Sequence, residues 1–154
     1  MEAVILIGMQ ASGKSCFYQQ RFADTHIRIN LDMLRSRHRE RILVEACLAA
    51  KQPFVVDNTN PTAADRARYI PAAKAAGFKI VGYYFQSSLD ECQRRNQART
   101  GKKVIPLAGL RRFQSLFEPP SLTEGFDALY HVKTGPAMSF VVEEWSERHA
   151  EGAG

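Results

Sequence analysis

The residues with the clearest chemical capacity form one glycine-bounded segment near the start of the chain. The segment runs from Gly8 to Ser15, reads GMQASGKS, and fits the pattern G-x-x-x-x-G-K-[ST]. In this pattern the turn directs successive backbone N–H groups inward, and the helix that follows adds the positive end of its dipole. The segment also comes directly after an apolar run and before a helical segment. We therefore expect a phosphate-binding loop here.

Two side chains of this loop have distinct expected roles. Lys14 can reach the β and γ phosphates of a nucleoside triphosphate, and the Ser15 hydroxyl can ligate Mg²⁺. The predicted cofactors are therefore ATP and Mg²⁺, with Ser15 as the metal ligand and Lys14 also as a catalytic residue. The residues expected to bind ATP in and beside the loop are Gly8, Gln10, Ala11, Ser12, Gly13, Lys14, Ser15 and Cys16.

A carboxylate and a guanidinium follow the second predicted strand, in the segment NLDMLR. Asp32 and Arg35 are three positions apart, so a helical turn would bring them to one face, with Cβ atoms about 5 to 6 Å apart. The pair suits an acceptor that carries a hydroxyl beside a phosphate. Asp32 would take the hydroxyl proton as a general base, and Arg35 would bind the phosphate. The alternative is an Asp helix cap beside a surface arginine.

A second carboxylate, Asp57, ends the third predicted strand in the sequence VVDNTN. An acidic group at this position supports Mg²⁺ or orients an arginine that binds the acceptor, and the sequence does not separate the two roles. A structural Asp that caps the next turn is the alternative. We place Asp57 and Thr59, in the turn that follows, among the residues expected to bind the acceptor.

Two arginines near position 97 indicate a lid. Arg95 and Arg99 are four positions apart on a predicted helix, and the basic stretch Gly101-Lys102-Lys103 follows them. A lid over residues 95–105 would exclude water and bring guanidinium charge to the transferring phosphoryl group, with Arg99 as a catalytic residue. Both arginines are also expected to bind ATP. The alternative is one more exposed basic helix.

The charge of the chain is unevenly distributed. The net charge is +5, but residues 1–112 hold 19 basic and 9 acidic residues and so carry +10, whereas the remaining 42 residues carry −5. Arginine outnumbers lysine fourteen to seven, which suits bidentate phosphate contacts. The run of Arg35, Arg37, Arg39 and Arg41 either follows a nucleic-acid backbone or forms a solvated helix face, and the sequence favours neither.

Apolar runs and helical segments alternate along the chain, which predicts an α/β fold. We expect a P-loop kinase domain over residues 1–154, with a mainly parallel five-stranded sheet, helices on both faces and a short lid. In such sheets ligands bind beyond the carboxyl ends of the strands. The apolar segments with strand character are Ala3–Ile7, His26–Asn30, Phe54–Asp57, Phe78–Phe85, Leu129–Lys133 and Phe140–Trp145.

Local signals mark the helices. Leu34–Lys51 has helical periodicity, and a second helix begins after Thr62, is interrupted by Pro71 and stops at Gly77. Thr62 with Asp65, and Ser88 with Glu91, have the spacing of a capping box. The helix after Ser88 should reach about Arg99, and a further helix should run from Pro106 to about Phe117.

Composition sets limits on class and location. The 154 residues are 45% hydrophobic and 24% charged, as in ordinary globular chains, so disorder and fibrous structure are excluded. The apolar runs are far shorter than the roughly 20 residues of a membrane span, and no signal peptide opens the chain. Three scattered cysteines are expected to be reduced, and the four histidines to be non-catalytic. We therefore expect a cytoplasmic protein that does not associate with membranes.

The ordered motifs resemble those of the 5′-hydroxyl polynucleotide kinase family, in particular the kinase half of bifunctional polynucleotide kinase/phosphatases. The resemblance covers Val4 to about Tyr130 and is carried by GMQASGKS, NLDMLR, VVDNTNP with RARYI, RRNQARTGKKVIP and FEPPSLTEGF. It implies Lys14 and Ser15 on ATP and Mg²⁺, Asp32 as the general base and Arg35 on the acceptor phosphate. It also implies Asp57 beside the active site, and Arg99 with Arg95 as lid residues that contact the nucleotide.

The expected function is the ATP-dependent transfer of a γ-phosphate to the 5′-hydroxyl end of DNA or RNA in nucleic-acid repair. The chain has no D-x-D-G-T-like motif, so 3′-phosphatase activity is not expected of it. One alternative is a small-molecule kinase similar to the zeta-toxin-like sugar-nucleotide kinases or the chloramphenicol phosphotransferases, which share the phosphate-binding loop. The other is an ATP-binding module without catalysis.

Overall fold

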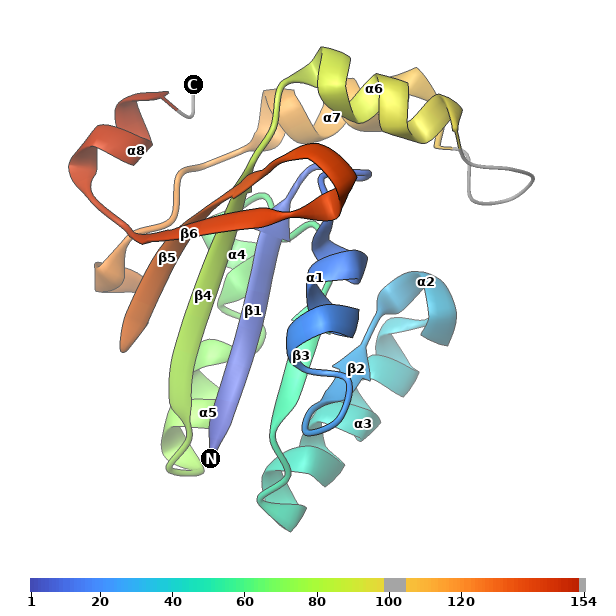
Figure 1. The fold of residues 1–154 in the computed structure, drawn as a ribbon. Coiled ribbons are helices and arrows are strands. Elements are labelled where there is room, and N and C mark those ends of the chain that lie inside the picture. The colour runs from blue at the N-terminus through green and yellow to red at the C-terminus, as the bar shows by residue number, and fades with distance from the viewer. Residues whose placement is uncertain (99–104, 153–154) are drawn as a thin grey trace.

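A six-stranded sheet forms the centre of the computed structural model, which describes residues 1–98 and 105–152 (Figure 1). The strand order is β2-β3-β1-β4-β5-β6, and all neighbours are parallel except β5 and β6. The strands are β1 (Glu2–Gly8), β2 (Ile27–Ile29), β3 (Phe54–Asp57), β4 (Lys79–Gln86), β5 (Ala128–Thr134) and β6 (Phe140–Glu144).

The predicted mainly parallel sheet is confirmed, but the expected count of five strands is wrong. The sixth strand, β6, returns beside β5 after the short 3₁₀ turn at Pro136–Met138 and pairs with it antiparallel, Val142 opposite Val132. A tight connection of this kind allows only antiparallel pairing, so β6 adds an edge strand to the parallel set.

The strand β1 lies between β3 and β4, with Ala3 opposite both Phe54 and Ile80. Residues on both of its faces are buried, and Ala3 to Ile7 have no exposed surface at all. This position explains the unbroken apolar run in the sequence, because a central parallel strand is covered by helices on both sides.

Helices cover both faces of the sheet and the edge at the carboxyl ends of its parallel strands (Figure 1). One face packs on α1, and the opposite face packs on α3 and α5, while α6 and α7 lie above the strand ends. The helices are α1 (Lys14–Arg21), α2 (Leu31–Leu34), α3 (Arg37–Ala50), α4 (Ala63–Arg66), α5 (Ile70–Ala75), α6 (Leu89–Gln97), α7 (Leu107–Leu116) and α8 (Glu147–Gly152).

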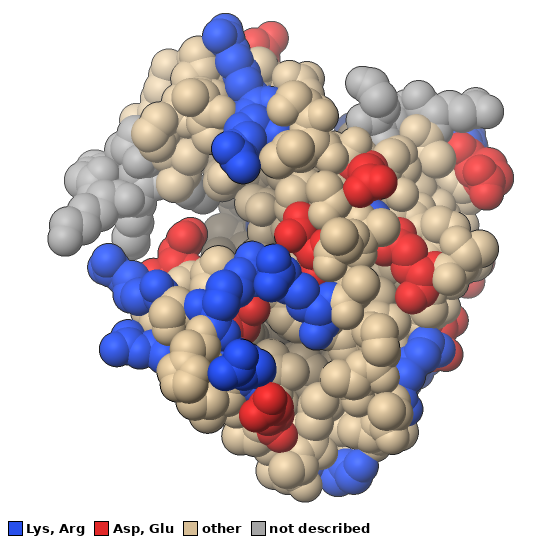
Figure 2. Space-filling view, turned by 180° about the vertical axis from the view of Figure 1, so that it is seen from behind, with Lys and Arg blue, Asp and Glu red and all other residues tan. Residues whose placement is uncertain are grey.

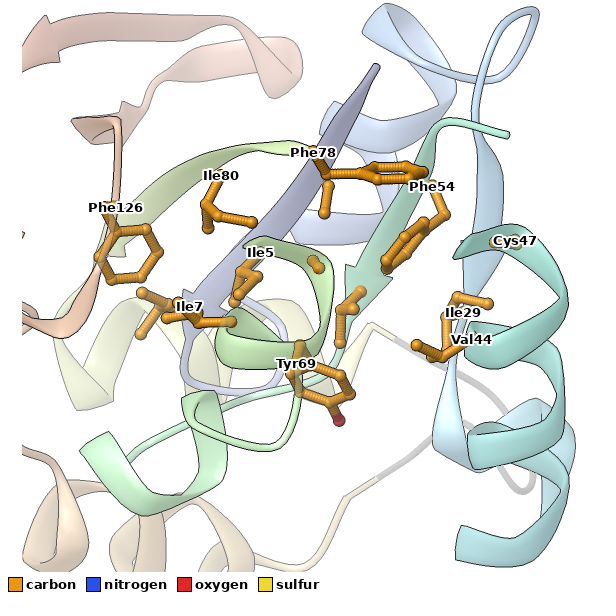
Figure 3. Packing of buried hydrophobic residues seen from close by; sticks show 14 of the residues in the cluster. Ile5, Ile7, Ile29, Val44, Cys47, Phe54, Tyr69, Phe78, Ile80 and Phe126 are labelled. Atoms are coloured by element: carbon orange, nitrogen blue, oxygen red, sulfur yellow. The ribbon is translucent and has the colours of Figure 1, made fainter. Parts of the chain in front are cut away.

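Three apolar clusters follow this layering. The largest, between the sheet and α3 and α5, contains Ile5, Phe54 and Ile80, and Ile5 lies between the other two in Figure 3. The cluster on the α1 face is centred on Phe17. The third packs Met9 of the predicted phosphate-binding loop against α6 and α7. The loop is thus packed against α6 and α7 through an apolar layer of its own.

The helix starts predicted from capping chemistry are confirmed where the structure describes them. Thr62 and Asp65 form a reciprocal capping box, and the Ser88 hydroxyl accepts from the Glu91 N–H at 3.1 Å. Pro106 is the N-cap of α7, as expected. Each of these starts depends on contacts within four residues, which is why the local sequence predicts them.

Two helix boundaries differ from the prediction. The helix expected over Leu34–Lys51 begins only at Arg37, because Arg35 adopts a left-handed conformation with φ of 72° and Ser36 is the N-cap. The helix expected to be kinked by Pro71 is in fact two helices, α4 and α5, with Pro71 in the first turn of the second. A proline is tolerated there, since the N–H groups of a first turn lack helical partners.

The three cysteines lie in α1, α3 and α6 and form no disulfide, as expected; Cys16 is exposed and the other two are buried. Within residues 1–98 and 105–152, no helix has the length and apolarity that crossing a bilayer requires.

A buried ion pair joins α4 to the segment before β5. The Arg66 side chain has no exposed surface, and its guanidinium donates to both carboxylate oxygens of Glu124 at 2.7 and 3.1 Å. It also donates to the carbonyls of Asn60 and Glu118. Arg66 therefore holds the turn after β3 against a segment more than fifty residues later.

Replacing Glu124 with alanine should lower the free energy of unfolding by about 3 to 5 kcal/mol, because it leaves the Arg66 guanidinium buried without its counter-ion. Urea denaturation measures the change. Arg68→Ala is the matched control: its 3.9 Å ion pair with Asp65 is partly exposed, so its loss should cost less than about 1 kcal/mol. Equal losses in the two variants would contradict this account of Arg66.

Candidate active site

The predicted phosphate-binding loop connects β1 to α1, and its two glycines are required by its shape. Gly13 is the N-cap of α1 with φ of 105°, which L side chains rarely adopt. A Cβ there would lie 3.1 Å from the Thr134 hydroxyl. At Gly8 a Cβ would lie 2.9 Å from the Phe85 Cβ and from the Ser12 hydroxyl. The loop therefore closes only with glycine at both positions.

Three distant segments hold the loop in place. The Gly8 N–H donates to the Thr59 carbonyl at 3.0 Å, the Thr134 hydroxyl donates to the Ser12 carbonyl at 2.8 Å, and the Arg95 guanidinium donates to the Ala11 carbonyl at 3.2 Å. Thr59, which the sequence predicts to bind the acceptor, and Arg95, which it predicts to bind ATP, thus both contact the loop backbone. Thr134 was missed, because no local pattern marks a threonine at the end of β5.

The Lys14 ammonium is held within the loop. It donates to the carbonyls of Gly8 and Met9, both at 2.8 Å, and to the Ser12 hydroxyl at 3.4 Å. The side chain is only 7% exposed. Its positive charge is therefore fixed at the point where the sequence predicts that phosphate groups bind.

Ser15, Asp57 and Arg28 form a triangle of hydrogen bonds at the start of α1. The Ser15 hydroxyl donates to Asp57 Oδ2 at 3.0 Å, and the Arg28 guanidinium donates to the same oxygen at 2.8 Å and to the Ser15 oxygen at 3.0 Å. Asp57 is 2% exposed and Arg28 is 28% exposed. The partner of Asp57 is thus Arg28 in β2, a residue that the sequence analysis did not select, and not Arg35.

The chemistry of Ser15 and Asp57 fits Mg²⁺. Magnesium is bound through oxygen ligands, usually one or two carboxylates together with substrate phosphates and water. A serine hydroxyl and a carboxylate 3.0 Å apart beside a phosphate-binding loop supply this donor set. Among the described residues there is no group of three or more His, Cys, Asp or Glu side chains that could hold a metal.

Asp32 lies in α2, and the end of β3 holds the start of this helix. The Asn30 side chain caps the helix by accepting from the Met33 N–H, and it donates to the Asp57 carbonyl at 2.6 Å. The Leu31 N–H donates to the Asn58 side chain at 2.8 Å. The backbone on either side of Asp32 is thereby tied to β3.

The expected pairing of Asp32 and Arg35 on one helical face is only partly realised. The helix α2 ends at Leu34, and Arg35 follows it as a left-handed C-cap. Both side chains are exposed, and the ion pairs within the described ranges do not include one between them. Both residues are therefore on the surface beside the site, without a direct contact.

A buried carboxylate from α3 supports this arrangement. Glu40, 4% exposed, accepts from the Tyr69 hydroxyl at 3.0 Å, from the Asn58 amide at 2.9 Å and from Arg37 at 2.8 Å. Burial, and then the charge of Glu40, raises the pKa of Tyr69 to about 12, so the hydroxyl remains a donor at neutral pH. Glu40 thus fixes Asn58, which in turn holds α2. Glu40 lies among the alternating charged residues at the start of α3, so the sequence alone did not indicate this role.

An open pocket of about 490 Å³ lies next to the loop. It is bounded by Glu91, Arg94 and Arg95 of α6 on one side and by residues 134–138 on the other.

Arg99 and most of the predicted lid over residues 95–105 lie outside the described residues. Of the other residues predicted to bind ATP, Cys16 is exposed on α1. The Gln10 side-chain oxygen is buried without a hydrogen-bond partner in the described part of the chain.

Comparison with known proteins indicates the family of the chain. Residues 4–120 match the sequence model of a family described as an AAA domain. The bifunctional polynucleotide phosphatase/kinase of Schizosaccharomyces pombe is 31% identical over 130 residues, covering 81% of this chain and 32% of that protein. The putative bifunctional polynucleotide phosphatase/kinase of Acanthamoeba polyphaga mimivirus is 27% identical over 136 residues, covering 83% and 32%. The chain thus spans about a third of the length of these curated relatives.

Solved structures support the same fold. A gluconokinase from Sinorhizobium meliloti superposes with a TM-score of 0.58 at 21% identity, covering 86% of this chain and 82% of that one. The resemblance to polynucleotide kinases that the sequence motifs indicated is confirmed by the relatives. The chain therefore belongs to the AAA domain family, with the fold of a P-loop kinase.

Proposed function

We propose that the protein is an ATP-dependent kinase that transfers the γ-phosphate to the 5′-hydroxyl end of DNA or RNA. The observation that carries the proposal is the double role of the end of β3. Asp57 and Thr59 contact the phosphate-binding loop, while Asp57 and Asn58 hold the segment that contains Asp32. The end of β3 thus supports both the loop expected to bind the phosphate donor and the segment that contains the expected general base.

ATP is the phosphate donor in this proposal. Lys14 and the loop backbone would bind its phosphates, and the adjoining pocket between α6 and residues 134–138 has room for the nucleoside. Ser15 and Asp57 would hold Mg²⁺, which when bound neutralises phosphate charge. Arg95, held on the Ala11 carbonyl, places a guanidinium between the loop and the pocket. In this proposal Gln10, Cys16 and Arg99 also bind ATP, and Arg99 is a catalytic residue.

On the acceptor side, Asp32 is the better candidate for the general base. Asp57 is buried and already accepts two hydrogen bonds, whereas Asp32 is exposed in α2, which follows the carboxyl end of β2. In the proposed step the 5′ oxygen forms a bond to the γ-phosphorus, the bond from that phosphorus to ADP breaks, and the hydroxyl proton moves to Asp32. Arg35 would bind the phosphate next to the hydroxyl.

The basic surface of the protein bears on the class of acceptor. Lys and Arg side chains gather over the α2 and α3 side of the molecule in Figure 2, and Arg35, Arg39 and Arg41 are exposed there. Arg111 and Arg112 of α7 are exposed as well. A surface with this much positive charge exceeds what one small phosphorylated acceptor needs and fits a polyanionic strand. Arg37 belongs to it only in part, because it pairs with Glu40.

A small-molecule acceptor is the second candidate, favoured by the fold shared with a gluconokinase. The exposed acceptor residues and the charge on α3 argue for the polynucleotide instead. Rephosphorylation of 5′-hydroxyl ends would place the protein in nucleic-acid repair, within the cytoplasm in our proposal. A module that only binds ATP is the third candidate, and it would transfer no phosphate to any oligonucleotide.

Changing Asp32 to Asn should lower 5′-phosphorylation of an oligonucleotide by about 10²- to 10⁴-fold, because a positioned base typically contributes that much. Affinity for ATP should stay the same, since Asp32 is not part of the loop. Transfer of radiolabel from ATP to 5′-hydroxyl DNA and RNA measures the effect, with the exposed Asp24→Asn as the matched control. A variant that is as active as the wild type, or a wild type that labels no oligonucleotide, would end the proposal.

Changing Asn58 to Ala should reduce kcat about tenfold or more with little change in KM for ATP. The substitution removes the acceptor of the Leu31 N–H and the donor to Glu40, so the segment that contains Asp32 loses its anchor. Steady-state kinetics at varied ATP separate the two parameters. A raised KM for ATP with unchanged kcat would show that Asn58 acts on the loop instead.

If a nucleic-acid strand binds along α3, the affinity for an oligonucleotide should fall steeply as the salt concentration rises. Arg41→Gln should then reduce the slope of log affinity against log salt concentration by about 1. Fluorescence anisotropy with a labelled single strand measures both. Lys79→Gln, which removes an exposed charge at the amino end of β4 opposite the loop, should leave the slope unchanged. A salt-independent affinity would favour the small-molecule acceptor.

A further inference from the structure

We propose that Arg28 is an internal cation that competes with the divalent metal for the oxygens of Ser15 and Asp57, and thereby sets the magnesium requirement of nucleotide binding. The inference rests on the proposed function, because it takes the loop to bind a nucleotide with Mg²⁺. It concerns a residue of β2 that the phosphate-loop motif does not contain.

The geometry places one guanidinium on both expected metal ligands. Arg28 Nε lies 2.8 Å from Asp57 Oδ2, and its Nη2 lies 3.0 Å from the Ser15 oxygen. The Ser15 hydroxyl donates to the same carboxylate oxygen at 3.0 Å. All three groups therefore meet at one point, and the positive charge at that point is supplied by the chain itself.

A metal ion and this guanidinium exclude one another at these oxygens. Mg²⁺ binds oxygen at about 2.0 to 2.1 Å, and an ion on both Ser15 and Asp57 would lie within a few ångströms of the guanidinium nitrogens. Two cations at such a separation repel strongly, and more so beside a carboxylate that is almost fully buried. Binding of the ion therefore requires Arg28 to leave both oxygens.

This exchange has a physical rationale. Without a metal, Arg28 supplies a counter-ion to Asp57, so the buried carboxylate is never left alone. Its side chain is 28% exposed, so it can move toward solvent without repacking the core. Because the ion must first displace the guanidinium, its affinity for the site is highest when nucleotide phosphates add further ligands. Arg28 would thus make metal binding depend on the nucleotide.

The test is the binding of a fluorescent, non-hydrolysable ATP analogue to the full chain during a Mg²⁺ titration. In Arg28→Gln, the Mg²⁺ concentration that gives half of the magnesium-dependent gain in affinity should fall about tenfold, the expected size of one lost charged hydrogen bond. Affinity without magnesium should not change. Arg28→Lys keeps the charge but has one nitrogen in place of the two that contact Asp57 and Ser15, so its half-saturating concentration should be intermediate.

Arg21→Gln, which removes one exposed charge at the end of α1, is the control and should match the wild type. An unchanged magnesium requirement in Arg28→Gln overturns the inference, as does loss of nucleotide affinity without magnesium, which would make Arg28 a phosphate ligand. If Arg28→Gln does not fold, Arg28→Lys decides: a requirement equal to that of the wild type overturns the inference. A wild type with no magnesium-dependent nucleotide binding overturns the proposed function with it.

Discussion

The buried carboxylate of Asp57 is the group on which the site depends. It ends β3, the strand that lies between β1 and β2, so its end is next to the loop that follows β1 and the helix that follows β2. Its side chain bonds Ser15 and Arg28, and its backbone carbonyl bonds Asn30. A single residue therefore connects the phosphate-binding loop to the segment that contains Asp32, and this connection follows from the strand order.

The charged groups of the site divide into two sets. Lys14, Asp57 and Glu40 are buried and held by several hydrogen bonds each, as buried charges must be, so their positions are fixed before any ligand arrives. Asp32 and Arg35 are exposed on a short helix and its cap. Within the buried set, Lys14 and Asp57 lie at the phosphate-binding loop, whereas Glu40 supports Asn58 and the segment that contains Asp32. The exposed set is where, in our proposal, an acceptor would approach. Such preorganisation lowers the entropic cost of assembling two substrates.

Much of the fold followed from local patterns. The apolar run of β1 predicted a strand covered on both faces, and Thr62 and Ser88 predicted the starts of α4 and α6. The predictions were wrong where contacts between distant segments decided the structure. Pro71 was compatible with a kink or with the first turn of a new helix, and only packing selects between them. The strand β6 became a sixth member of the sheet because its turn returned it beside β5.

By itself, the sequence determined the phosphate-binding loop, because its function depends on backbone shape and a helix start that eight consecutive residues encode. It also placed Asp32 and Asp57 at strand ends, where a parallel sheet gathers its ligands. Only the tertiary structure decided the partners of those residues. The bonds from Arg28 to Asp57, from Asn58 to Glu40 and from Thr134 to Ser12 join segments from 18 to 122 positions apart. Such pairings depend on strand order and register, which no local pattern of residues specifies.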